Sequence, residues 1–263
     1  MKVGFIGLGN MAGAMIGGLV KDDSFTGEIY GFDVAAKVRE SRAKEFGITA
    51  CDSNKEVVSA SDYLVLAVKP QFIGNVIQEI RELLRPEQVV ISIVAGKSIA
   101  WFTEAFGKEI KLVRCMPNTA ALVGAAITGV TPAPRVTEAE LAAALSIIES
   151  FGKASVVSEH LMDAVVGVSG SAPAYVFMFI EAMADGAVAA GMPRAQAYEF
   201  AAQAVYGSAK LMIDTGKHPG ELKDMVCSPA GTTIEAVKVL EEKNFRGAVI
   251  DAVLAATEKS KML

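Results

Sequence analysis

Residues 2–12 of the chain read KVGFIGLGNMA, and this stretch decides the fold. A short apolar run, typical of a buried strand, leads directly into the spacing G-x-G-x-x-A at Gly7, Gly9 and Ala12. The first glycine of this spacing permits a tight turn, the second lets the backbone approach a pyrophosphate, and the third small residue keeps helix and strand close. Free N–H groups at the start of the next helix favour an anion. The pattern predicts dinucleotide binding, with candidate contacts at Ile6, Gly7, Leu8, Gly9, Asn10 and Met11.

Strand-like and helix-like stretches alternate as far as residue 158. The sequence predicts strands at Lys2–Ile6, Glu28–Phe32, Tyr63–Val68, Val89–Val94, Ile110–Cys115 and Lys153–Val157, and helices at Asn10–Val20, Ala35–Phe46, Phe72–Leu84 and from a capping box at Thr137–Glu140 through Ser150. The YLVLAV run at 63–68 has no polar alternation, as expected for a strand covered on both faces. Alternating strands and helices predict a Rossmann-like, doubly wound parallel sheet over residues 1–158.

Beyond residue 158 the strand-like runs stop. Leu161–Ala190, Ala195–Thr215 and Ile234–Thr257 are Ala-rich and apolar on every side, which predicts an all-α domain over residues 159–263. A helix that is hydrophobic all round must be buried. Two ways of burying it stay open, which are packing against the first domain and packing against a second subunit. We expect the second subunit, because so few residues offer little surface to pack against.

Composition excludes several classes of protein. Of 263 residues, 52% are hydrophobic and 21% charged, which excludes a disordered chain. The net charge is −5, and neither side of residue 158 has the basic excess that nucleic-acid binding needs. Three widely spaced cysteines and two histidines argue against a disulfide scaffold and against a zinc site.

Nothing in the sequence predicts membrane insertion. The start of the chain lacks the pattern of a signal peptide, because glycines interrupt its apolar run. The longest uncharged candidate for a span, Ala164–Ile180, is shorter than the ~20 residues that a bilayer requires and contains Pro173. We therefore expect a cytoplasmic protein with reduced thiols.

Asp33 ends the second predicted strand. A carboxylate at this position can bind the ribose 2′-OH of NAD and repels the 2′-phosphate of NADP. Lys37, Arg39 and Arg42 follow closely and can offset that charge. The choice between NADPH and NADH stays open.

The sequence resembles pyrroline-5-carboxylate reductase over essentially its whole length. The resemblance rests on GFIGLGNM at 4–11, LAVKPQ at 66–71, RCMPNT at 114–119, SGSAPAY at 169–175 and HPGELKDMVCSPAGTT at 218–233. It implies an N-terminal domain that binds NAD(P)H and a helical domain that forms a homodimer, often assembled into a larger homo-oligomer. The implied reaction is hydride transfer to the C=N carbon of 1-pyrroline-5-carboxylate, which gives L-proline.

A substrate with one carboxylate and one imine needs an anion site. The loop Ser228–Thr233 precedes a helix, and Thr232 with Glu235 predicts a T-x-x-E capping box. Loop and helix start together predict a carboxylate cradle. The resemblance implies that Val226, Ser228, Gly231, Thr232 and Thr233 bind substrate, with the Thr233 hydroxyl near the ring nitrogen as the candidate catalytic donor.

The resemblance also implies further cofactor contacts. Asn54 is expected at the adenosine ribose. Asn118, because it follows another predicted strand, is expected on the nicotinamide side. The other implied contacts follow two predicted strands: Ala67, Val68, Lys69, Pro70, Ala95 and Gly96.

Two departures from the family pattern are Ala172 and Ala230, where glycine is usual. We expect these alanines to tighten packing without removing function. One rival is a β-hydroxyacid dehydrogenase, which needs an acid–base lysine early in its helical domain. Residues 161–193 contain no Lys, Arg or His, which argues against it. The other rival is a nucleotide-sensing protein without catalysis.

Overall fold

The computed structural model describes residues 1–262. The chain divides into two compact units, of which unit 1 comprises Met1–Gly170 together with the last residues from Ala256 onward. Unit 2 comprises Ser171–Ala255.

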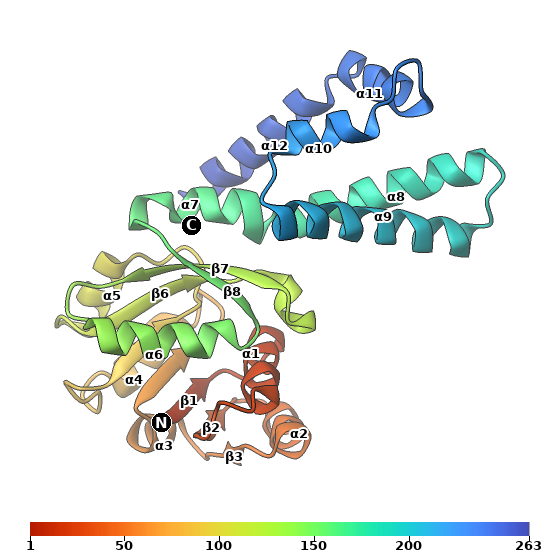
Figure 1. Ribbon diagram of the computed structural model, residues 1–263. Coiled ribbons are helices and arrows are strands. Elements are labelled where there is room, and N and C mark those ends of the chain that lie inside the picture. The colour runs from red at the N-terminus through yellow and green to blue at the C-terminus, as the bar shows by residue number, and fades with distance from the viewer. Residues whose placement is uncertain (263) are drawn as a thin grey trace. The chain divides into compact units, whose positions relative to one another are not determined.

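Unit 1 is an eight-stranded sheet with helices on both faces (Figure 1). The strands are β1 (Lys2–Ile6), β2 (Glu28–Phe32), β3 (Thr49–Ala50), β4 (Tyr63–Leu66), β5 (Val89–Ser92), β6 (Lys111–Met116), β7 (Ala126–Pro132) and β8 (Gly152–Val156). The helices are α1 (Asn10–Lys21), α2 (Ala36–Phe46), α3 (Asn54–Ala60), α4 (Ile73–Ile80), α5 (Ile99–Phe106) and α6 (Glu138–Glu149), with a 3₁₀ turn η1 at Thr119–Val123. The strand order is β3-β2-β1-β4-β5-β6-β7-β8, which is that of a doubly wound fold.

The register of the strands explains the core. Val3 and Phe5 of β1 belong to one hydrophobic cluster, which α1 and α6 complete, whereas Ile6 belongs to the other, which α3, α4 and α5 complete. Successive side chains of a strand point to opposite faces, so a doubly covered strand is apolar throughout. The prediction of a doubly covered YLVLAV strand is confirmed, because Leu64, Val65 and Leu66 are all buried.

The alternation of strands and helices predicts a fully parallel sheet, and this prediction is wrong for one strand pair. β7 runs antiparallel to β6, and β8 then runs parallel to β7. Only the short segment around η1 separates β6 from β7, too short for the helical crossover that a parallel neighbour needs. β7 itself is not among the predicted strands. The predicted capping box of α6 is present, with Thr137 and Glu140 bonding each other's backbone N–H.

The helices of the second half begin before unit 2. They are η2 (Glu159–Leu161), α7 (Met162–Val165), a π turn η3 (Val166–Gly170), α8 (Ala172–Ala189), α9 (Arg194–Thr215), α10 (Pro219–Val226), α11 (Thr232–Glu242) and α12 (Phe245–Ser260). The stretch 234–257 is helical, as expected, but it is divided between two helices, because Asn244 has a positive φ of 56° and separates α11 from α12. Antiparallel α8 and α9 lie side by side (Figure 1).

The helices of unit 2 have almost no core of their own. Their buried hydrophobic cluster consists of Ala184, Ala197 and Ala201. Large apolar side chains are exposed along the same helices, among them Phe177, Phe200 and Ile250. Unit 2 by itself therefore leaves much apolar surface in water, as expected of a surface that packs against another protein.

One helical run among residues 1–262, Glu159–Ala189, is long and apolar enough to cross a membrane by length and composition alone. Its mean hydropathy is 1.4, and 11% of its most apolar window is buried. The run is not one regular helix, because the π turn Val166–Gly170 interrupts it. An apolar exposed helix of this kind equally suits a protein interface.

Candidate active site

The phosphate loop between β1 and α1 is held to two neighbouring strands. The Gly7 N–H donates to the Phe32 carbonyl at the end of β2, 2.9 Å away. Gly7 has a φ of +91°, and a Cβ there would lie 2.8 Å from the Ala67 carbonyl oxygen after β4. Only glycine accommodates both the dihedral angle and the contact. The predicted tight turn is therefore present, wedged between the ends of β2 and β4.

The start of α1 fits an anion. Its N-cap residue is Gly9, no side chain caps it, and its first turn contains no acidic residue. A Cβ on Gly9 would meet no atom within 4 Å, so the space beside this backbone is open. The N–H groups of Asn10 and Met11 have no intrahelical acceptor and are left for a ligand. Uncapped amides, a favourable helix dipole and open space suit a dinucleotide pyrophosphate.

Leu8, inside this loop, is held by both of its polar backbone atoms. Its N–H donates to the Asp33 carboxylate at 2.9 Å, and its carbonyl accepts from Arg42 Nε at 3.3 Å. Asp33 also accepts from the Ala35 N–H at 2.9 Å. Arg39 stacks over the Phe32 ring and donates to the Asp33 carbonyl at 3.4 Å. Asp33 thus fixes the loop and places a negative charge beside it.

A cavity of about 380 Å³ opens beside this loop at the carboxyl ends of β1, β2 and β4. Ligands of doubly wound sheets bind at this end of the strands. The structure brings together five predicted cofactor residues here: Ile6, Gly7, Asp33, Asn54 and Val68. Val34, 89% exposed, and Phe72 supply apolar surface to the same cavity.

α4 and the residue before it form one wall of this cavity, which none of the sequence motifs predicts. That wall consists of Phe72, Asn75, Val76 and Glu79. Their spacing of three, four and seven residues places them on one helix face. The sequence does contain a signal for this wall, because the predicted helix Phe72–Leu84 directly follows the YLVLAV strand, at whose end cofactor contacts are expected.

The remaining predicted cofactor residues after β4 and β5 lie outside this cavity. Ala67, Lys69 and Pro70 follow β4, and Ala95 and Gly96 follow β5, with Gly96 at a φ of +72°. Lys69 is exposed, and within residues 1–262 it forms no ion pair. A free ammonium therefore stands at the carboxyl end of the central strands.

Asn118 follows β6 and makes a contact that the amino-acid sequence does not predict. Its Nδ2 donates to the Ser169 carbonyl in the π turn, 3.2 Å away. Its Oδ1 is buried and accepts no hydrogen bond from the described residues. π turns are frequent at functional sites, and a buried acceptor without a partner suits a ligand donor. The predicted place of Asn118 beside the nicotinamide stays a prediction.

The predicted substrate residues lie in unit 2, around the start of α11. The Gly231 N–H donates to the Ser228 carbonyl at 3.0 Å and closes a turn. The N-cap of α11 is Gly231, and no side chain caps this helix. The predicted capping box of Thr232 and Glu235 is therefore wrong by one position, because Thr232 is already helical. The consequence favours anion binding, since the first N–H groups of α11 have no internal partner.

Thr233 occupies the second helical position of α11. It is half-buried, and its hydroxyl makes no hydrogen bond to any of residues 1–262. A threonine hydroxyl can donate one hydrogen bond and accept others. Thr233 therefore has a donor available beside the uncapped amides of the same helix.

The expectation that Ala230 tightens packing is wrong. It is exposed and has a φ of +54°, in the left-handed region that favours glycine. With Pro229 before it, Ala230 stands where a type II turn requires a positive φ. Its methyl group strains the turn without filling a cavity. The substrate loop therefore holds a strained residue next to the N-cap of α11.

Two of the cysteines are poor nucleophiles. Burial raises the pKa of the Cys115 thiol well above its usual range, and it raises the pKa of Cys51 as well. A thiol must ionise to react, so both side chains act as small apolar groups. No group of three or more His, Cys, Asp or Glu able to hold a metal occurs in residues 1–262.

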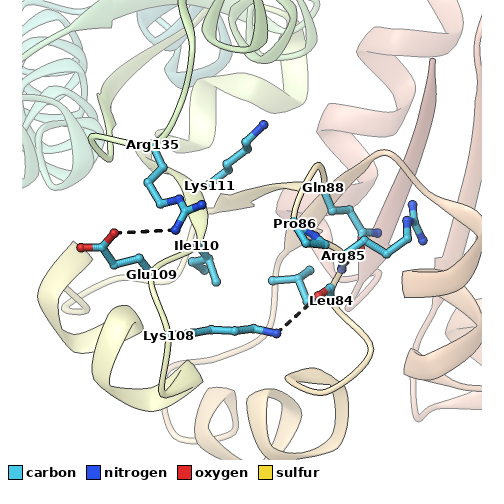
Figure 2. A pocket seen from close by; sticks show the side chains of 9 residues that line it. All are labelled: Leu84, Arg85, Pro86, Gln88, Lys108, Glu109, Ile110, Lys111 and Arg135. Carbon is cyan, nitrogen blue, oxygen red and sulfur yellow. Dashed lines mark hydrogen bonds and ion pairs between the residues drawn. The ribbon is translucent and has the colours of Figure 1, made fainter.

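A second cavity, of about 220 Å³, lies at the amino ends of β5 and β6 and has four cationic side chains in its wall (Figure 2). Three of these four charges are paired with carboxylates, and the fourth, Lys108, is hydrogen-bonded to a backbone carbonyl. Arg85 binds Glu87 and the Ser61 carbonyl, Lys111 pairs with Glu140, and Arg135 turns toward Glu109. Lys108 reaches the Leu84 carbonyl (Figure 2). This cavity therefore offers little charge to a ligand, and it lies at the strand ends opposite to those that bind cofactors.

Comparison with known proteins identifies the family. The model described as pyrroline-5-carboxylate reductase dimerisation matches residues 159–263. A curated pyrroline-5-carboxylate reductase of Escherichia coli K12 is 52% identical over 263 residues, covering 100% of this chain and 98% of the relative. The chain belongs to the pyrroline-5-carboxylate reductase family. The resemblance stated from the sequence motifs is thereby confirmed.

Solved structures agree with this assignment. A pyrroline-5-carboxylate reductase from Coxiella burnetii superposes with a TM-score of 0.94 at 32% identity, covering 99% of this chain and 97% of that one. The Plasmodium falciparum enzyme, solved with NADP bound, superposes with a TM-score of 0.86 at 31% identity, covering 100% and 97%. A model of NADP oxidoreductases, coenzyme F420-dependent, matches residues 2–96. A nicotinamide cofactor therefore belongs to this reductase family fold, and the phosphate loop described above fits it.

Proposed function

We propose that the protein reduces 1-pyrroline-5-carboxylate to L-proline with NADH or NADPH. The observation that carries this proposal is a pair of uncapped helix starts, each preceded by a glycine. One, at α1, suits the cofactor pyrophosphate, and the other, at α11, suits the substrate carboxylate. Hydride adds to the C=N carbon, the C=N π electrons become a nitrogen lone pair, and a proton on that nitrogen completes the amine. The reduced nicotinamide supplies the hydride.

Thr233 is the proposed catalytic residue. Its free hydroxyl donates a hydrogen bond to the lone pair that develops on the ring nitrogen as hydride adds, while Ser228, Gly231 and Thr232 hold the carboxylate, with Val226 contributing apolar contact. A protonated imine already accepts hydride well, so orientation can supply most of the rate enhancement. This explains a site without an acid–base pair such as a carbonyl reductase needs.

We also propose that Asp33 shifts the cofactor preference of the protein toward NADH and away from NADPH. Two backbone N–H groups, from Leu8 and Ala35, hold the carboxylate at the cavity. The fixed negative charge opposes a 2′-phosphate and accepts from a 2′-hydroxyl. Arg39 offsets it incompletely, because its guanidinium binds the Asp33 backbone carbonyl and lies over the Phe32 ring.

We propose that the two domains of the chain have different functions. Residues 1–158 bind the cofactor, and residues 159–263 bind the substrate and join two subunits. The exposed apolar side chains of α8 and α9 are then covered by the same helices of a partner, which also accounts for the apolar run Glu159–Ala189. Further assembly of dimers and a cytoplasmic location belong to the same proposal.

The test is a turnover assay with purified protein. 1-Pyrroline-5-carboxylate is supplied with NADH and, separately, with NADPH, and the loss of the reduced cofactor's absorbance is followed while proline is quantified. Equal amounts of cofactor consumed and proline formed support the proposal. Cofactor binding without consumption contradicts it and favours a sensor, whereas faster use of NADPH contradicts the role given to Asp33.

A further inference from the structure

Asn54 and Glu79 form a polar pair in the wall of the 380 Å³ cavity. Asn54 is the first residue of α3, Glu79 lies on α4, and Asn54 Nδ2 donates to a Glu79 carboxylate oxygen at 2.8 Å. Asn54 is 7% exposed, so its amide has few alternative partners in water. A hydrogen bond to a charged acceptor is stronger than one between neutral groups. This contact therefore restricts the amide.

The amide is not used to stabilise its own helix. Ser53 is the N-cap of α3, and its side chain accepts from the Glu56 N–H at 3.2 Å. Asn54 follows the cap and makes no such contact. Its side chain therefore serves something other than the start of α3.

The chemistry of the pair fixes which way the amide faces. An ionised carboxylate can only accept, so the amide nitrogen must face Glu79 and the amide oxygen must face away from it. Among residues 1–262, no hydrogen-bond donor reaches this oxygen. The cavity wall thus presents a fixed acceptor that lacks a donor.

We propose that Glu79 is a positioning residue for the cofactor: by binding the Asn54 amide nitrogen, it presents the Asn54 oxygen to a ribose hydroxyl of the adenosine half. A hydroxyl donates to such an oxygen, whereas a 2′-phosphate has only acceptor oxygens and is repelled. Asp33, on the cavity wall contributed by β2, adds a second carboxylate with the same preference. The inference rests on the cofactor site of the proposed function.

The experiment measures binding rather than turnover. ADP-ribose and 2′-phospho-ADP-ribose are titrated by calorimetry into the full-length protein, because these probes contain the adenosine half without the nicotinamide. In Glu79→Gln the new amide can donate as well as accept, so the Asn54 amide is free to turn around. We expect affinity for ADP-ribose to fall about threefold to tenfold, with little loss for 2′-phospho-ADP-ribose.

Two further variants identify the cause. Glu82→Gln removes the same charge from an exposed side chain that follows α4 outside the cavity, and it should leave both affinities unchanged. In an Asn54→Ala background, Glu79→Gln should have no additional effect on ADP-ribose, since Glu79 acts through Asn54. Unchanged affinities in Glu79→Gln, or an undiminished effect without Asn54, overturn the proposal. Wild-type protein that binds ADP-ribose but does not turn over leaves it standing and contradicts the proposed function instead.

Discussion

Unit 1 and unit 2 differ in how they bury apolar side chains. Unit 1 encloses two hydrophobic clusters, one on each face of its sheet, with Phe5, Phe102 and Phe151 fully buried. Unit 2 buries three alanines and leaves Phe177 66% exposed. Both have the apolar content of a globular protein, so composition does not separate them. The difference teaches that unit 1 is stable through its own core, whereas unit 2 depends on association.

The largest effect is expected from breaking that association. Phe177→Asp introduces a carboxylate on α8 that would be buried without a partner when two subunits associate. The substitution should therefore weaken dimerisation about 1,000-fold or more. Light scattering over a range of concentrations measures this. Leu83→Asp is the matched control, because Leu83 is 41% exposed but belongs to unit 1. A dimer that persists in Phe177→Asp, or dissociates equally in Leu83→Asp, would contradict the comparison.

The next effect separates the two units by function. Thr233→Ala in unit 2 should lower kcat about 10- to 100-fold, because a donor to the reacting nitrogen is lost. The Kd for the cofactor, measured by fluorescence titration, should stay within about twofold, because phosphate-loop residues in unit 1 set it. Thr233→Ser keeps the hydroxyl and should recover most of the rate. Equal losses of kcat and cofactor affinity would refute the assigned role.

A charge change in unit 1 should act in the opposite way, on cofactor choice rather than on the chemical step. Asp33→Asn removes the charge and keeps an oxygen that accepts from a backbone N–H. The ratio of kcat/KM for NADPH to that for NADH should rise about tenfold, the equivalent of about 1.4 kcal/mol. Asp33→Ser should shift the ratio the same way but weaken binding of both cofactors, since Leu8 loses its anchor. An unchanged ratio would show that the ribose is recognised elsewhere.

The smallest effect concerns two alanines of unit 2, Ala172 and Ala230, at positions where the family usually has glycine. Ala230→Gly relieves a positive φ and should raise the free energy of unfolding by about 1 kcal/mol. Ala172→Gly, at the first position of α8, should lower it by up to about 1 kcal/mol, because glycine is the poorer helix former. Urea unfolding at one fixed protein concentration measures both. Shifts of the same sign would contradict the strain assigned to Ala230.

Much of unit 1 can be predicted from sequence because its signals are local. The bounds of β1 and β2 agree with the prediction to the residue, and the Thr137–Glu140 box marks the start of α6. β7 follows no comparable signal, since its direction depends on pairing with β6. The break between α11 and α12 inside the helical stretch 234–257 depends on one dihedral angle, at Asn244, which no local pattern specifies.

The candidate site divides in the same way. Gly7, Gly9 and Asp33 have positions that a short motif specifies, so sequence reasoning places them at the cavity and the phosphate loop. Glu79 and Asn75 reach the same cavity only because α4 packs beside α3, which no local pattern states. For a related reason, the sequence pattern places the N-cap of α11 one residue too late, at Thr232. Thr232 and Gly231 both suit an N-cap, and the turn from Ser228 selects the glycine.

The poor core of unit 2 also has a consequence for the cell that makes the protein. If folding of this part is completed by a second copy, the folded fraction rises with the concentration of chains. Halving expression then lowers activity by more than half, and newly made chains that have not met a partner are the most exposed to proteases. For a protein that folds in this way, a reduction in gene dosage lowers the total activity by more than the same factor.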